Sequence, residues 1–371
     1  MVPVGQAFLR NLTRGLSSAG EALNCTDVTA GQDEILTRVD QGVGFLTLNR
    51  PKAINSLTHP MVTTMRALLA DWAQDDSVRA VVLAGAGERG LCAGGDIVAV
   101  YNSARSDGEE ARQFWYDEYL LNAQIAHYPK RFVSLMDGIV MGGGVGVSAH
   151  ANTRVVTDTS RVAMPEVGIG FVPDVGGTYL LSRAPGNLGP HAALTGAPFS
   201  GSDAIAMGFA DHYLPHEALD DFLQAIVDDD VDAALEQHAI ASPFSEWVAQ
   251  RSWIDDCYSG ETVTDIVAAL RGHDAGPAQD AANLIATRSP TALAVALEAV
   301  RRAARLETLE DVLRQEYRVS CGALRSHDLV EGIRAQVIDK DRNPKWSPSS
   351  LAGVSKADVD AFFSPVEREP F

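Results

Sequence analysis

The chain has 371 residues, of which 46% are hydrophobic and 21% are charged. This length and composition are typical of a globular protein that buries a large core without disulfides or metal ions. The formal net charge of −19 excludes a generally basic surface, so we expect neither a nucleic-acid nor a membrane partner. The four cysteines contain no CxxC pair, which is typical of a reducing compartment. We expect the cytoplasm, with the mitochondrial matrix as the alternative.

The first half of the chain alternates predicted strands and helices. Residues 1–30 show neither pattern and are predicted to form a flexible tail. Apolar periodicity then predicts, in chain order, strands at 35–39 and 44–50, a helix at 61–75, a strand at 79–85, a helix at 109–126, and strands at 132–138 and 153–158. Strands separated by such helices indicate a largely parallel sheet, so the predicted fold class is α/β.

The second half is predicted to be mostly helical. Helical spacing of apolar residues covers the segments 218–227, 231–240, 261–271, 290–304, 308–321 and 325–338. Pro344, Pro348 and Pro365 indicate an extended end. We therefore expect an α/β core over residues 31–225 and a helical region over residues 226–371 that packs on this core.

Two glycine-rich turns follow predicted strands. CAGGD ends at Asp96, and MGGGVG begins at Met141. Main-chain N–H groups in such turns can point into a pocket, and two of them aimed at one point form an oxyanion hole. The alternative is that these glycines only permit tight turns. Neither segment has the glycine spacing of a nucleotide-binding loop.

A loop from Ala163 to Gly177 carries two carboxylates. Its proline and glycine content prevents a regular helix or strand, and such loops often carry catalytic groups. Glu166 and Asp174 could act as a base and its partner acid, or as a nucleophile and a base. The alternative for Asp174 is a helix N-cap, because Val-Gly-Gly-Thr-Tyr-Leu-Leu follows it. Together, the acids and the glycine turns indicate acyl chemistry.

Several segments together carry a resemblance to a known family. They are LNRPKAINSL (48–57), LCAGGDI (91–97), FWYDEYLLNA (114–123), DGIVMGGGVGVSAH (137–150), AMPEVGIGFVPDVGG (163–177), ALTG (193–196) and EYRVSCGALRSHDLVEGIRAQVIDKDRNPKW (316–346). With them the chain resembles the crotonase (enoyl-CoA hydratase/isomerase) superfamily. Within it the chain is most similar to the 3-hydroxyisobutyryl-CoA hydrolase branch, of which the last segment is typical.

The resemblance implies a crotonase-like spiral of ββα repeats with a helical carboxy-terminal region. It implies a CoA thioester whose carbonyl lies between the main-chain N–H groups of Gly95 and Gly143, with Glu166 and Asp174 as the active-site acids. The residues expected to contact the substrate or to line the CoA entrance are Glu118, Ala93, Asp96, Arg50, Lys52 and Ala53. CoA is part of the substrate, so no separate cofactor and no metal ion are expected. Such proteins commonly assemble, so a homo-oligomer is expected.

One position departs from the hydratases of this superfamily. They usually carry a second catalytic glutamate two residues after the last glycine of the turn, and here that position is Gly146. A two-glutamate hydration mechanism would lack one member. The difference favours hydrolysis of a short hydroxyacyl thioester, 3-hydroxyisobutyryl-CoA, as in valine breakdown. The alternatives are an enoyl-CoA hydratase or isomerase, and a catalytically silent CoA-binding scaffold.

Overall fold

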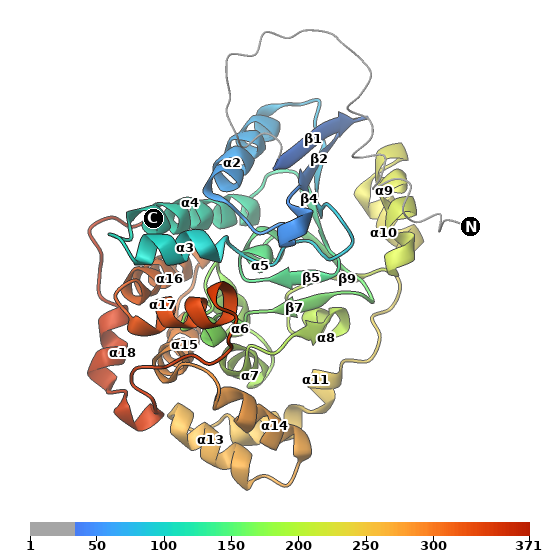
Figure 1. Cartoon of the computed structure of the whole chain (residues 1–371). Helices are drawn as coiled ribbons and strands as arrows, with labels where there is room; N and C mark the ends of the chain where they lie inside the picture. The colour runs from blue at the N-terminus through green and yellow to red at the C-terminus, as the bar shows by residue number, and fades with distance from the viewer. Residues whose placement is uncertain (1–33) are drawn as a thin grey trace.

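A six-stranded and a three-stranded sheet lie at the centre of the computed structural model, which describes residues 34–371 (Figure 1). The tail predicted over residues 1–30 lies outside the described residues. The larger sheet has the order β1-β2-β3-β4-β6-β9 and contains β1 (Ile35–Asp40), β2 (Val43–Leu48), β3 (Ala80–Gly85), β4 (Arg131–Met136), β6 (Thr153–Val156) and β9 (His212–Tyr213). The smaller sheet has the order β5-β7-β8 and contains β5 (Ile139–Met141), β7 (Arg161–Ala163) and β8 (Phe199–Ser200).

Helices cover the sheets and make up most of the carboxy-terminal half. Up to β9 they are η3 (Pro51–Ala53), α2 (His59–Gln74), α3 (Ile97–Ala104), α4 (Glu109–Ala126), α5 (Gly143–Ser148), η4 (Glu166–Ile169), α6 (Gly177–Leu181), α7 (Leu188–Thr195) and α8 (Gly201–Ala206). After β9 they are η5 (His216–Ala218), α9 (Leu219–Asp228), α10 (Val231–His238), α11 (Glu246–Ala249), α12 (Arg251–Cys257), α13 (Val263–Gly272), α14 (Gly276–Ile285), α15 (Pro290–Ala303), α16 (Leu309–Ala323), α17 (His327–Ile333), η6 (Arg334–Ile338), η7 (Leu351–Gly353) and α18 (Lys356–Phe362).

The chain passes repeatedly from the larger sheet to the smaller one. β4 is followed by β5 and α5, and β6 is followed by β7 and η4, which gives the predicted strand–strand–helix repeats. β5 and β7 are parallel, and Met141 at the end of β5 pairs with Ala163 at the end of β7. The glycine turn after β5 and the acid loop after β7 therefore leave the smaller sheet at the same edge.

Apolar side chains alternate between the two faces of the larger sheet. Val43, Phe45 and Val82 pack with α9 and α10 on one face. Leu46 and Leu83 belong to the main core on the other face, where α2 packs. Figure 1 shows α2 and the α9–α10 pair on opposite sides of this sheet. A sheet covered on both faces explains why its strands are nearly continuous apolar runs.

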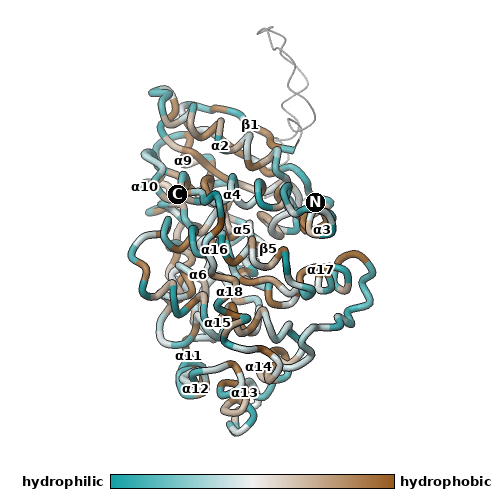
Figure 2. Tube along the Cα trace, turned by 90° about the vertical axis from the view of Figure 1, so that its left-hand side faces the viewer, coloured by the Kyte–Doolittle hydropathy of each residue, from teal (hydrophilic) through white to brown (hydrophobic). Residues whose placement is uncertain are grey.

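The carboxy-terminal helices share the main core with the sheets. One buried apolar cluster extends from Ile35 to Phe363 and includes Leu293 of α15 and Leu313 of α16. Figure 2 shows apolar and hydrophilic residues interspersed along these helices, as amphipathic helices require. The boundary predicted at residue 225 falls within α9, and the division into 31–225 and 226–371 stays a prediction. None of the helices formed by residues 34–371 has the length and apolar character that crossing a bilayer requires.

Most predicted elements appear with shifts of one to a few residues. The helix predicted at 109–126 is confirmed as α4. The extended end predicted around the last prolines is wrong over the segment of α18. There Ser355 accepts a hydrogen bond from the Asp358 N–H and the Asp358 side chain accepts one from the Ser355 N–H, a capping box that starts a helix.

Candidate active site

The two glycine turns lie side by side. The Cys92 N–H donates to the Ile139 carbonyl at 3.1 Å, and the Met141 N–H donates to the Cys92 carbonyl at 2.9 Å. A Cβ atom built on Gly143 would lie 3.2 Å from the Gly95 nitrogen. Main-chain bonds therefore hold the turn that contains Gly95 against the turn that contains Gly143.

Each turn offers a main-chain donor. Within residues 34–371, neither the Gly95 N–H nor the Gly143 N–H donates to another main-chain atom outside regular helices and strands. The preceding residues, Gly94 with φ 112° and Gly142 with φ 49°, have backbone conformations that residues with side chains rarely adopt. Both glycines are thus required to turn the chain at these points. Two free donors beside one cavity meet the requirement of an oxyanion hole.

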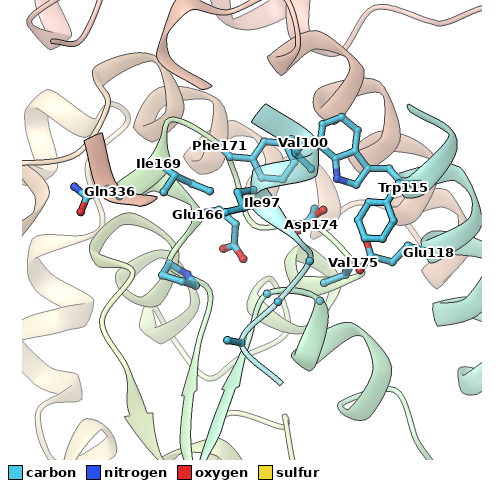
Figure 3. Close-up of a pocket in the computed structure, with 18 of the residues that line it drawn as sticks. Ile97, Val100, Trp115, Glu118, Glu166, Ile169, Phe171, Asp174, Val175 and Gln336 are labelled. Atoms are coloured by element: carbon cyan, nitrogen blue, oxygen red, sulfur yellow. The ribbon is translucent and has the colours of Figure 1, made fainter. Parts of the chain in front are cut away.

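A cavity of about 340 Å³ adjoins the paired turns. Of the residues predicted from the sequence, its lining includes Ala93, Gly95, Gly143, Glu118, Glu166 and Asp174. Figure 3 shows Gln336 and Ile169 at one end, Trp115 at the other, and Glu166 between them. The structure therefore brings the two turns together with Glu118, Glu166 and Asp174, whereas Asp96 does not line this cavity.

Glu166 adjoins the glycine turn through its carboxylate. It is the first residue of η4 and is only 6% exposed. Its Oε1 atom lies 2.9 Å from the position of a Cβ atom built on Gly142. Its Oε2 atom is buried and has no hydrogen-bond partner among the described residues. A buried carboxylate oxygen without a partner is costly, which is expected where a group is kept free for a ligand.

Asp174 does not cap a helix. The following helix, α6, has Gly176 as its N-cap and no side-chain cap bond, so the N-cap interpretation is wrong. The physical reason is that Val175 and Gly176, with φ 54° and 78°, turn the chain between the acid and the helix. Asp174 Oδ2 instead accepts a hydrogen bond from the Tyr119 hydroxyl at 2.8 Å. The carboxylate is thereby oriented at the cavity wall.

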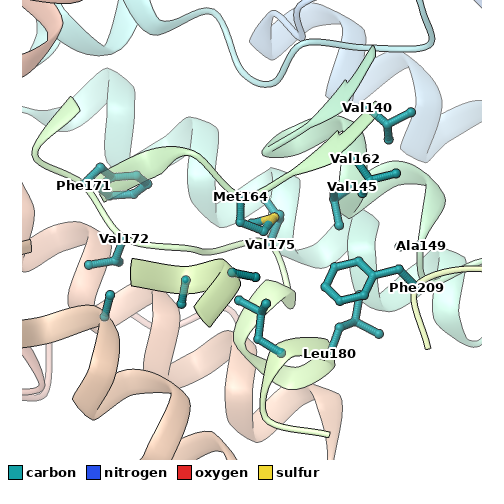
Figure 4. Close-up of a cluster of buried hydrophobic side chains, with 14 of the residues drawn as sticks. Val140, Val145, Ala149, Val162, Met164, Phe171, Val172, Val175, Leu180 and Phe209 are labelled. Atoms are coloured by element: carbon teal, nitrogen blue, oxygen red, sulfur yellow. The ribbon is translucent and has the colours of Figure 1, made fainter. Parts of the chain in front are cut away.

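Apolar packing anchors the loop that carries both acids. Figure 4 shows Val175 of the loop beside Met164 and Val172 farther along the loop, with Val140 and Val162 of the smaller sheet on the other side of Met164 from Val172. All five side chains are at most 2% exposed. Between η4 and α6 the loop has no helix or strand, so this packing holds the main chain that carries Asp174.

Glu118 lies on the opposite side of the glycine turn from Glu166. It belongs to α4, and its Oε1 atom lies 2.6 Å from the position of a Cβ atom built on Gly143. This oxygen is buried and has no hydrogen-bond partner among residues 34–371. The carboxylates of Glu166 and Glu118 therefore lie beside Gly142 and Gly143, and each has one buried oxygen without a hydrogen-bond partner among residues 34–371.

Burial raises the pKa of all three acids. The pKa values of Glu166 and Glu118 lie well above the usual value because both are buried, and the charge of Asp174 adds to the effect. Burial raises the pKa of Asp174 to about 7, while the hydrogen bond from Tyr119 acts in the opposite direction. Carboxyl groups that repel one another titrate as one coupled system. The three carboxyl groups therefore keep their protons to a higher pH than exposed carboxyl groups do.

Several residues predicted to contact the substrate or to line the CoA entrance lie outside the cavity. Arg50, Lys52 and Ala53 do not line it, and Lys52 and Ala53 are exposed on η3. Arg50 pairs with Asp96 at 3.0 Å and with Glu34 at 3.0 Å. Asp96 borders a neighbouring hollow of about 550 Å³ that shares only Val100 and Phe114 with the first cavity. The CoA contacts of these four residues stay predictions.

Sequence reasoning missed much of the cavity wall. Trp115 and Phe171 stack with ring centroids 5.3 Å apart, and Arg288 and Gln336 reach the cavity from the carboxy-terminal half. Arg288 donates two hydrogen bonds to the Thr195 carbonyl, at 2.7 and 3.0 Å. The aromatic pair lies beside residues already singled out, but no local pattern marks Arg288 or Gln336, because only tertiary packing brings them here.

Gly146 has no room for a side chain. A Cβ atom built there would lie 2.6 Å from Val175 Cβ and 2.8 Å from Asn122 Nδ2. Glu at this position would therefore displace the Asp174-bearing loop.

We expect Gly146→Ala to lower the free energy of unfolding by about 1–3 kcal/mol, because of overpacking. Urea unfolding measures this change. Gly272→Ala is the matched control, because a Cβ atom there would meet nothing within 4 Å. Equal stability of the two variants would contradict the steric argument.

The chain belongs to the enoyl-CoA hydratase/isomerase family, whose model matches residues 43–363. It is 39% identical to the 3-hydroxyisobutyryl-CoA hydrolase, mitochondrial, of Danio rerio over 91% of this chain and 91% of that protein. It is 38% identical to the mouse (Mus musculus) protein of the same name over 97% of both. Among solved structures, a carnitinyl-CoA dehydratase from Mycobacterium thermoresistibile is 68% identical, with a TM-score of 0.90 over 92% of this chain and 99% of that chain. The predicted family and the crotonase-like α/β fold are confirmed.

Proposed function

We propose that this protein hydrolyses a short hydroxyacyl-CoA thioester, 3-hydroxyisobutyryl-CoA, to CoA and 3-hydroxyisobutyrate, the step found in valine breakdown. The observation that carries the proposal is the closed position at Gly146. Val175 and Asn122 occupy the space that a second hydratase glutamate would need, whereas Glu166 and Asp174 both line the cavity. The names of the relatives from Danio rerio and Mus musculus support hydrolysis.

The mechanism begins with the thioester carbonyl between Gly95 and Gly143. Attack on its carbon converts the carbonyl oxygen into an oxyanion, which the two N–H groups stabilise. Glu166 either removes a proton from the attacking water or attacks the carbon itself to form an acyl intermediate that water then hydrolyses. A single turnover in water enriched in heavy oxygen tests for direct attack, because label enters the Glu166 carboxylate only when water opens a mixed anhydride at the Glu166 carbonyl.

The remaining acids complete the reaction. Collapse of the tetrahedral intermediate breaks the carbon–sulfur bond, and a proton from Asp174 neutralises the CoA thiolate. Glu118 accepts a hydrogen bond from the substrate hydroxyl through its free Oε1 atom. Water supplies the oxygen and the protons that appear in the acid and the thiol, so no separate cofactor is needed.

Thiol release tests this function. Purified protein is mixed with 3-hydroxyisobutyryl-CoA, with crotonyl-CoA and with carnitinyl-CoA, and free thiol and the absorbance of the conjugated double bond are followed together. We expect thiol release from the hydroxyacyl thioester and no change in the conjugated absorbance. Loss of crotonyl absorbance, or a new conjugated band from carnitinyl-CoA, without thiol release would replace hydrolysis by a hydratase or dehydratase function. Binding of all three thioesters without conversion would indicate a silent scaffold.

Asp174→Asn should change the pH dependence of stability. A raised pKa means that the folded state binds the proton more tightly, so this stabilisation is complete below the unfolded-state value and is lost as the pH rises through about 7. The variant removes the charge, so relative to the wild type we expect it to gain about 1–3 kcal/mol between about pH 5 and about pH 8. Urea unfolding at both pH values measures this gain, with exposed Asp280→Asn as the control. A pH-independent difference would contradict it.

The assembly and location of the protein follow from sequence expectations alone. We retain a homo-oligomer as a proposal, which analytical ultracentrifugation tests. A cytoplasmic location, with the mitochondrial matrix as the alternative, is proposed on the same basis. The two animal relatives are both named as mitochondrial.

A further inference from the structure

The turn after Asp174 has an unfavourable backbone conformation. Val175 has φ 54° and is 1% exposed, and Gly176 has φ 78°. A β-branched residue in the left-handed region is rare and persists only where surrounding contacts impose it. Something outside the loop must therefore hold this turn.

The carboxylate of Glu316 holds it. Glu316 belongs to α16 and is 1% exposed. Its Oε2 atom accepts a hydrogen bond from the Gly176 N–H at 2.7 Å. Its Oε1 atom accepts from the Thr178 N–H at 2.9 Å and from the Thr178 hydroxyl at 2.5 Å. Three donors on one buried carboxylate fix the main chain directly after Asp174.

The same helix also reaches the Asp174 side chain. Ser320 lies one turn after Glu316 on α16, and its hydroxyl is 2.8 Å from the Tyr119 hydroxyl. Tyr119 donates its proton to Asp174 Oδ2, so its oxygen is the acceptor for the Ser320 hydroxyl. Residues of α16 therefore hold Asp174 in two ways. Glu316 binds the main chain that follows Asp174, and Ser320 binds Tyr119, which in turn binds the Asp174 carboxylate.

We propose that α16 sets the position and the charge state of Asp174, with Glu316 as a positioning residue. This inference rests on the proposed function in that it assigns Asp174 a role in catalysis. Glu316 does not line the cavity, so it acts through Asp174 and not on the substrate. The carboxy-terminal segment 316–346, which contains no residue used in the reaction steps, thereby has a role through Glu316 and Ser320.

The charge of Glu316 matters as well as its hydrogen bonds. Burial and the charge of Asp174 raise its pKa, whereas the three hydrogen bonds donated to its two oxygens lower the pKa and favour the ionised form. The titratable groups packed around Asp174 are Glu118 and Tyr119 of α4, Glu166 of η4, Glu316 of α16, and His150 after α5, whose Nε2 is 2.8 Å from the Val175 carbonyl. Burial lowers the pKa of His150 to about 4, so it is neutral near pH 7. Glu118, Glu166 and Glu316 are all acids, so removing the negative charge of one of them favours ionisation of Asp174.

Two substitutions should move the titration of Asp174 in opposite directions. Glu316→Gln removes a nearby negative charge, so the pH inflection of kcat that disappears in Asp174→Asn should shift to lower pH. Tyr119→Phe removes a donor from the Asp174 carboxylate, so the same inflection should shift to higher pH. In both variants we expect kcat to fall by about 10- to 100-fold while KM changes by less than about 3-fold.

Controls separate positioning from folding. Gln315→Ala removes a buried side chain on the same helix, whose Nε2 donates to the Ala299 carbonyl at 3.0 Å. It should lower the melting temperature without moving the inflection. If Glu316→Gln lowers the melting temperature but leaves kcat and the inflection unchanged, Glu316 only stabilises the fold and the proposal is wrong. If Glu316→Gln fails to fold, Tyr119→Phe alone decides, and an unshifted inflection there overturns the proposal.

The protonation of Asp174 can also be measured without substrate, and therefore independently of the proposed function. Infrared difference spectra of the wild type during a pH titration report carboxyl protonation, and the band missing in Asp174→Asn belongs to Asp174. We expect this band to titrate at lower pH in Glu316→Gln and at higher pH in Tyr119→Phe. If the wild type releases no thiol but the band shifts as expected, the proposed function fails and the control of Asp174 by α16 stands. Shifts in the same direction in both variants would contradict that control.

Discussion

Glu166→Gln is expected to lower kcat for thiol release by about 10³- to 10⁴-fold while leaving thioester binding within about 3-fold. Glutamine has nearly the same size and can occupy the same place beside Gly142, but it can neither accept a proton from water nor attack a carbonyl. The Glu166 Oε2 atom makes no hydrogen bond within the described residues, so the substitution breaks no contact of that oxygen. The loss should therefore appear in kcat and not in folding.

Thiol-release kinetics measure kcat, and calorimetric titration with a non-hydrolysable thioester analogue measures binding. The matched control is Glu307→Gln, which changes an exposed glutamate between α15 and α16 and should leave both quantities unchanged. Full activity of Glu166→Gln would remove Glu166 from the mechanism. A variant that loses binding and catalysis together would indicate a structural role for this carboxylate.

Gly143→Ala is expected to lower kcat by about 10²- to 10³-fold, the usual effect of losing one oxyanion donor. The added methyl group would lie 2.6 Å from Glu118 Oε1 and 3.2 Å from the Gly95 nitrogen, in the space between the two glycine turns. It would therefore exclude the thioester oxygen from the two donors and also displace Glu118.

Gly272→Ala adds the same methyl group at the exposed carboxy-terminal end of α13, where nothing lies within 4 Å, and should have normal activity. Circular dichroism establishes whether Gly143→Ala is folded. A folded variant with wild-type kcat would show that the carbonyl binds elsewhere. The position of the oxyanion hole would then have to be assigned again.

The parts of the site that the sequence predicted come from short segments with strong local constraints. The glycine turns and the acid loop could be recognised because backbone conformation and loop chemistry restrict their composition. The prediction that Glu118 contacts the substrate depended on family resemblance, and the structure places its Oε1 atom beside Gly143. By contrast, Arg50 and Lys52 do not line the cavity, and their roles at a CoA entrance stay predictions.

The rest of the site depends on contacts between residues far apart in sequence. Arg288 reaches the cavity from the segment before α15, and Glu316 binds the Gly176 N–H from 140 residues downstream. Neither residue shows its role in the local apolar periodicity, because its contacts are with segments far away in the sequence. The N-cap interpretation of Asp174 failed for a similar reason, since Val175 takes a backbone conformation that its residue type disfavours.

The apolar cluster that extends from Ile35 to Phe363 prevents this enzyme from being divided into two fragments that fold separately. Strand residues and residues of the last helices exclude water from one another, so neither set can leave without exposing the other. Unfolding within residues 34–371 should then be cooperative, with the loop that carries Glu166 and Asp174 and the helices that support it lost in a single transition. A fragment that ends near residue 225 would lack a cavity wall, the anchor of the turn after Asp174 and part of its own interior.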